Sequence, residues 1–502
     1  MGWNKALDFF ETVKEEYIKN FPNIAFNDLY KNDSLKVQEL HQKEIDEYTL
    51  KYNDINNMST DIERNYISAI KNCSTCFERW IIELYDKNPE KYKDYINIIA
   101  NLKCTQYGDL LSLKYNLINV CSIGNVNDVW NLYDGLFREC RGVVMDMRDN
   151  ELVLTPFKKF FNIDELNETS MAEIEEKMNH AKVIEFSNKL DGSMQSARWY
   201  HGQAVMAGSS ALDPECSFQL KDGYKFIHDK VGYAEMLQDY PDYTFIFEYI
   251  SMDDQHVVKY KKDQEGLYLI GIRDVNTGDE LDYKTVLEFA SRYDILTTQI
   301  YKTTLKKVMT ELDNKKSSEA EGFVINIEGY RIKLKYNDYV QVHKVLSKLA
   351  SENAIVQVIA DGKWDDLIAK IPEASQNIVK EKGQLVLDYI ESVMNRTNKY
   401  VMEALTTVSV ENVSTETNDD KKNFMVYINN HVPTFFKGYC RNLYLDKDIN
   451  LLKRGPIGNE HYTTMREIKE YLSTWEHRTF NGQEKTEDKN ILNEIQNKTN
   501  MQ

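Results

Sequence analysis

The sequence lacks long apolar runs: none of eighteen or more residues occurs in the 502-residue chain, so we expect no membrane-spanning helix. A secretory signal is also missing, because the start MGWNKALDFF has no basic segment followed by an apolar stretch. Gly2 is present, but Ala6 replaces the Ser or Thr that a myristoylation site prefers. These absences predict a soluble protein of the cytoplasm, or of the host cytoplasm if the chain is viral.

Cysteine is scarce, and the seven residues are an odd number scattered through a long chain. This usage argues against a disulfide framework and fits a reducing compartment. Cys73 and Cys76 form one C-x-x-C pair, but no second pair or nearby His pair completes a zinc-binding set. We interpret the two residues as half-buried thiols of a helix.

Positive charge is in deficit, since 62 Lys and Arg face 80 Asp and Glu and the formal net charge is -18. A protein that coats nucleic acid with its whole surface is excluded, because phosphate contacts need Lys and Arg. A nucleic-acid enzyme with a local basic track remains compatible, and its overall acidity would suppress non-specific binding.

What is present divides the chain into three parts. Residues 1–104 place apolar residues at helical spacing, and residues 346–502 do so again. Between them, residues 105–345 are rich in short strands and turns, including a late hairpin that turns at Glu328-Gly329. An apolar stripe in the last part runs through Val386, Ile390, Val393, Val401 and Leu405. We therefore predict an α+β fold with a strand-rich core between two all-helical domains.

Lys189 is the first residue whose setting suggests chemistry. The strand before it places Glu185, Ser187 and Lys189 on one face, and Asp191-Gly192 then bends the chain. A lysine held at a strand end among other cations can lose its proton and act as a nucleophile. The plainer alternative is a strand that simply enters a turn.

Two later strands carry further charged residues. Glu248 lies in a strand that is apolar on both faces, so it needs a strong donor, either a buried cation or the ribose hydroxyl of a ligand. Arg331, Lys333 and Lys335 alternate with apolar residues and share one strand face. That face is either solvated or bound to an anion such as a polyphosphate.

Taken in chain order, these features resemble motifs I, III, IV and V of the covalent nucleotidyltransferases, which include ATP-dependent DNA ligases, RNA ligases and mRNA capping enzymes. The matching segments are Lys189-Leu190-Asp191-Gly192, Glu248, Glu321-Gly322-Phe323-Val324 and Lys333-Leu334-Lys335. Two upstream segments, Glu139-Cys140-Arg141-Gly142 and Pro156-Phe157-Lys158-Lys159-Phe160-Phe161-Asn162, narrow the resemblance to the phage T4 RNA ligase 1 family. It covers about residues 105–345.

The resemblance implies an antiparallel-sheet, ATP-grasp-like nucleotidyltransferase core in residues 105–345, a helical N-terminal extension in 1–104 and a helical RNA-specificity domain in 346–502. It implies an ATP-dependent RNA ligase that joins 5′-phosphate and 3′-hydroxyl ends through lysyl-AMP and RNA-adenylate intermediates. The expected partners are single-stranded RNA ends or a broken tRNA loop, which suggests tRNA repair. We expect a monomer.

The resemblance also assigns roles to individual residues. Lys189 would carry the AMP, Asp191 would order the loop around it, and Lys333 and Lys335 would hold the α-phosphate. Glu321 would position Mg²⁺ or Mn²⁺ or its bound waters. The remaining ATP-binding residues would be Arg141, Lys159, Phe161, Gly192 and Glu248, together with Glu321, Lys333 and Lys335.

The chain departs from the family pattern at Ala207, where relatives commonly have Lys or Arg before a Gly-Ser pair. This puts in doubt how the triphosphate is gripped, and Arg198 is one candidate substitute. Three other functions stay open: a DNA ligase, a GTP-dependent capping enzyme, and a degenerate domain that only binds RNA ends.

Overall fold

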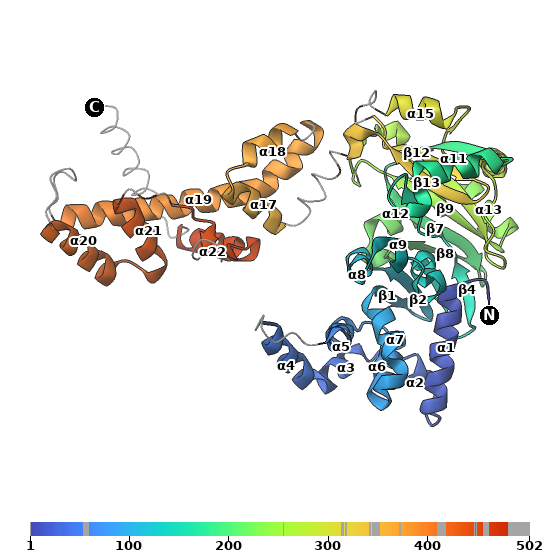
Figure 1. The fold of residues 1–502 in the computed structure, drawn as a ribbon, viewed down its shortest axis with the longest axis horizontal. Helices are drawn as coiled ribbons and strands as arrows, with labels where there is room; N and C mark the ends of the chain where they lie inside the picture. Colours follow the sequence, from blue (N-terminus) through green and yellow to red (C-terminus); the bar gives the residue numbers. More distant parts are fainter. Residues whose placement is uncertain are drawn as a thin grey trace. The chain divides into compact units, whose positions relative to one another are not determined.

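The structure, a computed structural model, describes residues 2–53, 60–254, 256–312, 316, 319–340, 343, 352–370, 373–408, 418–445, 447, 449–454 and 461–479. The chain forms two compact units, Met1–Tyr339 and Val340–Gln502. The ribbon is drawn in Figure 1, with the elements labelled in chain order.

The first unit begins with helices. They are α1 (Lys5–Asn20), α2 (Phe26–Leu29), α3 (Ser34–Leu40), α4 (Gln42–Asn53), α5 (Asp61–Asn72), α6 (Cys76–Lys87) and α7 (Pro89–Ala100). Cys73 and Cys76 are buried free thiols, but they lie at the junction of α5 and α6 and not within one helix as predicted. The reason is Thr75, which forms a capping box with Glu78 and starts a new helix.

A four-stranded antiparallel sheet follows, with β1 (Leu102–Tyr107), β2 (Leu110–Tyr115), β3 (Arg141–Asp146) and β4 (Glu151–Leu154) in that order. Short helices α8 (Leu117–Ser122), α9 (Val126–Val129) and α10 (Leu136–Glu139) join β2 to β3. The N-terminal helices share one apolar core with this sheet, and Lys14 Nζ donates to the Met147 carbonyl oxygen at 2.5 Å. Figure 1 shows α1, α6 and α7 against β1 and β2. Residues 1–104 are thus part of the first unit.

A second antiparallel sheet has the order β10-β9-β7-β8, with β7 (Ser193–Tyr200), β8 (Gln203–Gly208), β9 (Tyr243–Ile250) and β10 (Gly266–Asp274). Helices α12 (Phe218–Asp229), α13 (Val231–Asp239) and α14 (Tyr283–Arg292) pack on it and form its apolar core. Strand β9 reads YTFIFEYI, and its aromatic and β-branched residues favour a strand buried between neighbours.

The third sheet has five strands in the order β11-β6-β12-β13-β5. They are β5 (Phe161–Asn162), β6 (Ile184–Lys189), β11 (Ile300–Tyr301), β12 (Gly322–Ile327) and β13 (Tyr330–Lys335), flanked by α11 (Met171–His180) and α15 (Leu305–Glu311). The pairs are antiparallel except β13 with β5. The predicted hairpin turn is confirmed, because Glu328 and Gly329 connect β12 to β13 with positive φ at both residues.

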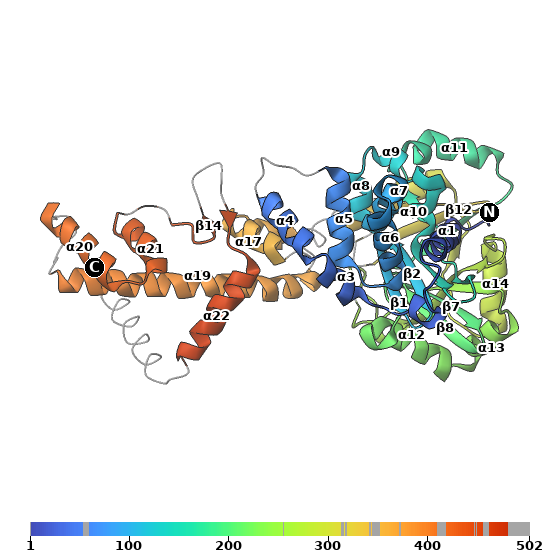
Figure 2. The same cartoon turned by 90° about the horizontal axis from the view of Figure 1, so that it is seen from below.

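Where the structure describes it, the second unit is helical apart from a short ladder of β14 (Lys453–Arg454) with β15 (His461–Tyr462). Its helices are α17 (Glu352–Ala360), α18 (Trp364–Lys370), α19 (Glu373–Thr407), α20 (Asn418–His431), α21 (Thr434–Tyr444) and α22 (Met465–Thr479). Figure 2 shows α20, α21 and α22 ranged along the long helix α19. The predicted stripe on α19 packs into the core of this unit.

The predicted fold class is confirmed: the protein is α+β, with antiparallel sheets between helical terminal regions. Among the described residues, no helix has the length and apolar character needed to cross a bilayer. The division of the first unit at residue 104 stays a proposal.

Candidate active site

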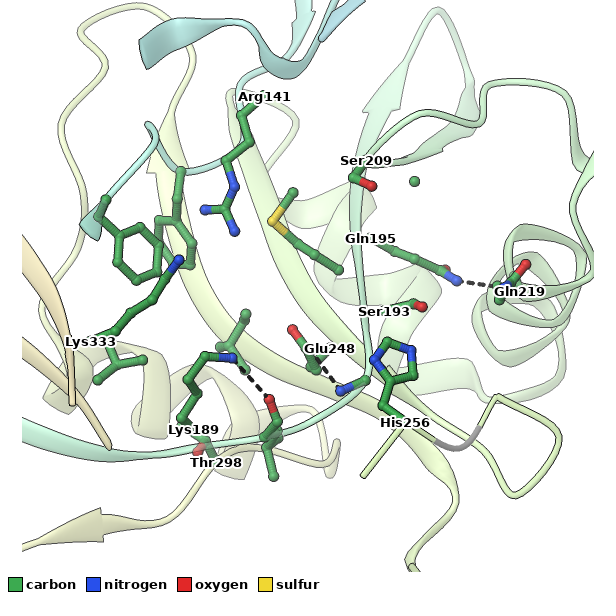
Figure 3. A pocket seen from close by; sticks show the side chains of 18 of the residues that line it. Arg141, Lys189, Ser193, Gln195, Ser209, Gln219, Glu248, His256, Thr298 and Lys333 are labelled. Carbon is green, nitrogen blue, oxygen red and sulfur yellow. Dashed lines mark hydrogen bonds between the residues drawn. The ribbon is translucent and has the colours of Figure 1, made fainter. Parts of the chain in front are cut away.

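A pocket of about 440 Å³ lies where the three sheets of the first unit meet. Its walls come from the ends of β2 and β3, from β6 and β13, and from β7, β8 and β9 (Figure 3). The basic side chains that line it are Lys114, Arg141, Lys189, Arg331 and Lys333, whereas Glu248 is the acid. This excess of cations in a chain of strongly negative net charge favours an anionic ligand at this place.

Lys189 ends β6 and points into this pocket (Figure 3). Its Nζ donates to Glu321 Oε2 at 2.7 Å, and Lys335 Nζ lies 2.8 Å from Glu321 Oε1. The carboxylate of Glu321 is only 3% exposed. One buried acid therefore holds two lysines from strands β6 and β13.

The sheet register explains this arrangement. Gly322 of β12 is paired with Lys189 on one side and Lys335 on the other, so the two lysines share a sheet face. Gly322 has φ +152°, and a Cβ there would collide with the Leu334 carbonyl oxygen. A glycine is therefore required between the two lysines.

The charge state of Lys189 differs from the sequence-based expectation. Burial by itself would lower the pKa of Lys189, but the carboxylates of Glu321 and Glu248 raise it above its usual value. We had expected neighbouring cations to favour loss of the proton, and this was wrong because the direct partner of the amine is an acid. Burial likewise tends to raise the pKa of Glu321, yet Lys189 and Lys335 lower it below its usual value.

Lys333 is the lysine that does meet other cations. Burial and the positive charges of Arg141 and Lys159 lower the pKa of Lys333 well below its usual value. Its Nζ lies 4.5 Å from the centre of the Phe160 ring. An anion that enters beside Lys333 would raise this pKa again.

Arg331, the third cation of the alternating face, has a different environment. Its side chain is paired with Glu280 and donates to the Tyr283 hydroxyl at 3.0 Å. The three cations predicted to meet one anion are therefore separated, with Arg331 and Lys335 each paired to an acid.

Glu248 lies opposite Lys189 in the pocket (Figure 3). Its Oε1 accepts a hydrogen bond from the Gly192 backbone N–H at 3.0 Å. Burial raises the pKa of Glu248 to about 7, against the opposing charge of Lys189. Gly192 is needed here, because a Cβ at this position would collide with the Tyr249 carbonyl oxygen.

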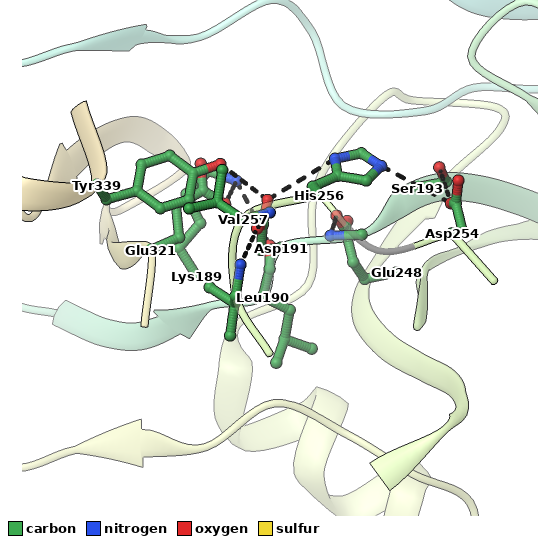
Figure 4. A network of polar contacts seen from close by, with 12 residues as sticks. Lys189, Leu190, Asp191, Ser193, Glu248, Asp254, His256, Val257, Glu321 and Tyr339 are labelled. Atoms are coloured by element: carbon green, nitrogen blue, oxygen red, sulfur yellow. Dashed lines mark hydrogen bonds and ion pairs between the residues drawn. The ribbon is translucent and has the colours of Figure 1, made fainter. Parts of the chain in front are cut away.

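Asp191 is 4% exposed and fixes the loop after β9 (Figure 4). Its Oδ2 accepts hydrogen bonds from the backbone N–H groups of Val257 and Val258 at 2.9 and 2.8 Å, and its Oδ1 accepts one from the Tyr339 hydroxyl at 2.8 Å. This loop brings His256 to the pocket, where Asp254 and then Asp191 raise the pKa of the imidazole.

Sequence reasoning missed both His256 and Tyr339, because their relation to Asp191 exists only in the folded chain.

It also missed what links the two segments upstream of Lys189, residues 139–142 and 156–162. Arg273 of β10, 1% exposed, lies 3.2 Å from Glu139 and donates to the Pro156 carbonyl oxygen at 2.8 Å. One buried guanidinium thus ties the two segments to the second sheet.

Arg141 begins β3 and reaches into the pocket, with its guanidinium 5.0 Å from the Phe160 ring centre (Figure 3). Its Nη1 is buried and has no hydrogen-bond partner within the part of the chain that the structure describes. A buried donor left unpaired is costly, so the site is ready for an acceptor such as a phosphate oxygen.

Lys159 and Phe161 do not line this pocket. Phe161 is 2% exposed and packs against Trp130, with ring centres 5.3 Å apart. Lys159 Nζ lies over the rings of Tyr115, Trp130 and Phe161. The aromatic residues that line the pocket are instead Phe157, Phe160 and two tyrosines, Tyr115 and Tyr283.

Ala207 is 1% exposed and packs in an apolar cluster with Val144 and Val153. Arg198, the candidate substitute, donates to the backbone carbonyls of Leu152 and Pro241 and does not line the pocket. The missing cation is therefore not replaced by Arg198.

A divalent metal fits this site only in a limited way. Both oxygens of Glu321 are held by lysines, so direct coordination would displace Lys189 or Lys335. Within the described segments, three potential ligands come close together only at Asp146, Asp149 and His201, outside the pocket. The residues present suit a metal that is bound mainly by phosphate oxygens and water.

Comparison with known proteins adds independent information. Residues 139–344 match a family model described as RNA ligase. A protein of Autographa californica nuclear polyhedrosis virus, named as a bifunctional polynucleotide kinase/RNA ligase, is 26% identical over 254 residues. One of Thermovibrio ammonificans, named as an RNA ligase, is 27% identical over 289 residues. The alignments cover 47% and 53% of this chain.

The chain spans 35% of the length of the viral relative and 69% of the bacterial one. Among solved structures, an archaeal ATP-dependent RNA ligase aligns with a TM-score of 0.38 and 12% identity, over 60% of this chain and 77% of that one.

Proposed function

We propose that the chain is an ATP-dependent RNA ligase that joins a 5′-phosphate to a 3′-hydroxyl, and the match of residues 139–344 to a family model described as RNA ligase supports this. The observation that carries the proposal is the buried Lys189–Glu321 pair, which opens onto the cationic pocket between the sheets. An amine held next to a polyphosphate-sized cavity is what covalent nucleotidyl transfer requires.

In the first step, Lys189 Nζ attacks the α-phosphorus of ATP. The Nζ–P bond forms, the bond to pyrophosphate breaks, and the ammonium group of Lys189 gives up two of its three protons to solvent, so that the phosphoramidate nitrogen keeps one. The ion pair with Glu321 raises the pKa of Lys189 and so favours the protonated amine before the nucleotide binds. Mg²⁺ or Mn²⁺ bound by the phosphates would supply the positive charge that releases this proton.

The other pocket residues bind and align the nucleotide. Lys333 holds the α-phosphate, whose negative charge opposes the burial and the neighbouring positive charges that lower the pKa of Lys333. Lys335, held by Glu321, is a further cation of the same strand. Arg141 donates through its free Nη1 to a phosphate oxygen. Glu248 accepts from a ribose hydroxyl, and Asp191 keeps the loop with His256 in place. Most of the catalysis is alignment and electrostatic stabilisation.

Lys159 and Phe161 act indirectly in this scheme. The positive charge of Lys159 helps to lower the pKa of Lys333. Phe161 holds Lys159 in place, because the Lys159 amine packs against the Phe161 ring. Glu321, whose two oxygens are held by lysines, would order the waters around a divalent metal carried in with the phosphates. The AMP next passes to the 5′-phosphate of an RNA end, and a 3′-hydroxyl then displaces it.

The RNA substrate that we propose is a broken single-stranded loop such as that of a cleaved tRNA. In the second unit, Lys437 and Arg441 are one turn apart on the same face of α21, where both side chains donate to Asn429. We propose that these two cations contact phosphates of the RNA.

The test is labelling with [α-³²P]ATP. Wild-type protein should form an acid-labile lysyl-AMP, whereas Lys189→Ala should show no label above background, and Lys182→Ala, an exposed lysine just before the same strand, should label normally. Labelling with GTP instead of ATP would indicate a capping enzyme. Sealing of nicked DNA but not of 5′-phosphorylated RNA would indicate a DNA ligase, and no labelling at all an RNA-end-binding domain.

A further inference from the structure

Lys114, the penultimate residue of β2, is a cation of the pocket that the sequence patterns did not single out. It lines the same cavity as Lys189, and its Nζ donates to Ser209 Oγ at 3.3 Å. No carboxylate lies within ion-pair distance of Lys114 in the described segments. Ser209 follows Gly208, directly after the buried Ala207 where related proteins commonly carry a cation.

The fold brings Lys114 to this place by a close approach of two sheets. Lys114 is paired with Arg141 across β2 and β3, at an irregularity in the register. The next residue, Gly142, has φ +91°, and a Cβ there would lie 3.3 Å from the carbonyl oxygens of Gly208 and Ser209. Glycine thus lets β3 pack on the end of β8, and Lys114 reaches Ser209 as a result.

The electrostatic setting of Lys114 also calls for an anion. Burial, together with the charges of Lys103 and Arg141, lowers the pKa of Lys114. Arg141 itself is buried, and its Nη1 has no partner in the described segments. Two neighbouring cations that are partly desolvated and have no acid as a partner cost folding free energy, and an anion bound between them would offset this cost.

Resting on the proposed ligase function, we propose that Lys114 and Ser209 bind the β- and γ-phosphates of ATP and so take the place of the cation missing at Ala207. Lys189 and Ser209 lie on opposite sides of the pocket (Figure 3). In an in-line displacement the nucleophile and the leaving group stand on opposite sides of phosphorus. When the P–O bond breaks, its electron pair stays on the departing pyrophosphate, next to Lys114.

The proposal predicts a defect limited to the steps that involve pyrophosphate. Lys114→Ala and Lys114→Gln should raise the KM for ATP in lysyl-AMP formation about ten- to a hundredfold, the value of a charge-assisted hydrogen bond. The same variants, once adenylated, should need a correspondingly higher concentration of inorganic pyrophosphate to release their AMP. Sealing of a pre-adenylated RNA end without ATP should be unchanged.

The control is Lys182→Ala. Lys182 is exposed just before β6 and does not line the pocket, so its loss should leave all three measurements unchanged. Thermal unfolding of each variant checks that the fold is intact, and Lys114→Gln keeps most of the side-chain volume if Lys114→Ala unfolds.

Three outcomes would overturn the inference. They are a normal KM for ATP in both Lys114 variants, unchanged discharge by pyrophosphate, or an equal loss in the sealing of pre-adenylated RNA, which would indicate a contact with RNA. Each presupposes that the wild type forms lysyl-AMP. Absence of labelling in the wild type would instead contradict the ligase function itself.

Discussion

Lys189 Nζ lies 2.7 Å from Glu321 Oε2, so the amine proposed as nucleophile is held by an acid rather than activated by cations. The other oxygen of Glu321 is held by Lys335. The acid therefore fixes the positions of both lysines while keeping the amine of Lys189 protonated until a ligand changes the balance of charge. This relationship leads to the first of four predictions.

Glu321→Gln should move the pH profile of lysyl-AMP formation to lower pH. Glu321 is the strongest acidic influence that raises the pKa of Lys189, so its neutralisation makes the free amine available at lower pH. The maximal rate should fall, because Lys335 and Lys189 lose the group that aligns them. Single-turnover labelling across pH 6–10 measures both effects. The control is Glu280→Gln, which breaks the ion pair with Arg331 and should leave the pH profile unchanged. An unchanged pH profile in Glu321→Gln would show that Glu321 does not set the pKa of Lys189.

Glu248→Gln should weaken nucleotide binding and yet stabilise the fold above neutral pH. The pKa of Glu248 is raised to about 7, above its usual value of 4.5, so ionisation of this acid costs folding free energy. The native protein binds the extra proton, and wild-type stability therefore falls as the pH rises from 4.5 through 7. The difference in melting temperature between variant and wild type should grow over this range. An equal difference at pH 5 and pH 8 would contradict the prediction.

Gly322→Ala should destabilise the protein by roughly 1–3 kcal/mol and impair lysyl-AMP formation. The added Cβ would collide with the Leu334 carbonyl oxygen, and the backbone φ at this position is one that other residues rarely adopt. Strands β12 and β13 must therefore move apart at Gly322, which is paired with both Lys189 and Lys335. Urea unfolding and labelling measure the two effects. Gly124→Ala, where a Cβ has open space, is the control and should change neither; a fully stable Gly322→Ala would show that the strand pairing tolerates the side chain.

Phe161→Ala and Phe160→Ala should fail in different ways. Phe161 is buried against Trp130, so its removal should cost about 3–5 kcal/mol of stability. Phe160 lines the pocket, and its ring packs against the cationic groups of Lys333 and Arg141. Its removal should chiefly raise the KM for ATP. Melting curves and labelling kinetics of both variants separate the two roles. A larger effect of Phe161→Ala than of Phe160→Ala on KM, at equal stability, would favour the direct ATP-binding role that the resemblance implies for Phe161.

The local patterns predicted the strands well. The alternation in β13 and the two-residue turn at Glu328-Gly329 fix the face of each side chain, because side chains on a strand alternate with period two. The prediction that Cys73 and Cys76 share one helix was wrong, because it did not recognise Thr75 as the cap at which α6 begins. Periodicity alone does not distinguish one long helix from two helices joined by a cap.

By itself, the sequence determined which elements form and which charged residues they carry, including Lys189 at the end of β6 and Glu248 and Lys333 within β9 and β13. Only the tertiary structure decided their partners, because ion pairing depends on which strands become neighbours and how deeply they are buried. Thus Glu321, which precedes β12, pairs with Lys189 of the neighbouring strand β6, and Arg331 pairs with Glu280. Lys114 of β2 contacts Ser209 at the wall of the pocket. Distance and desolvation set these charge states, and neither quantity can be read from spacing along a chain.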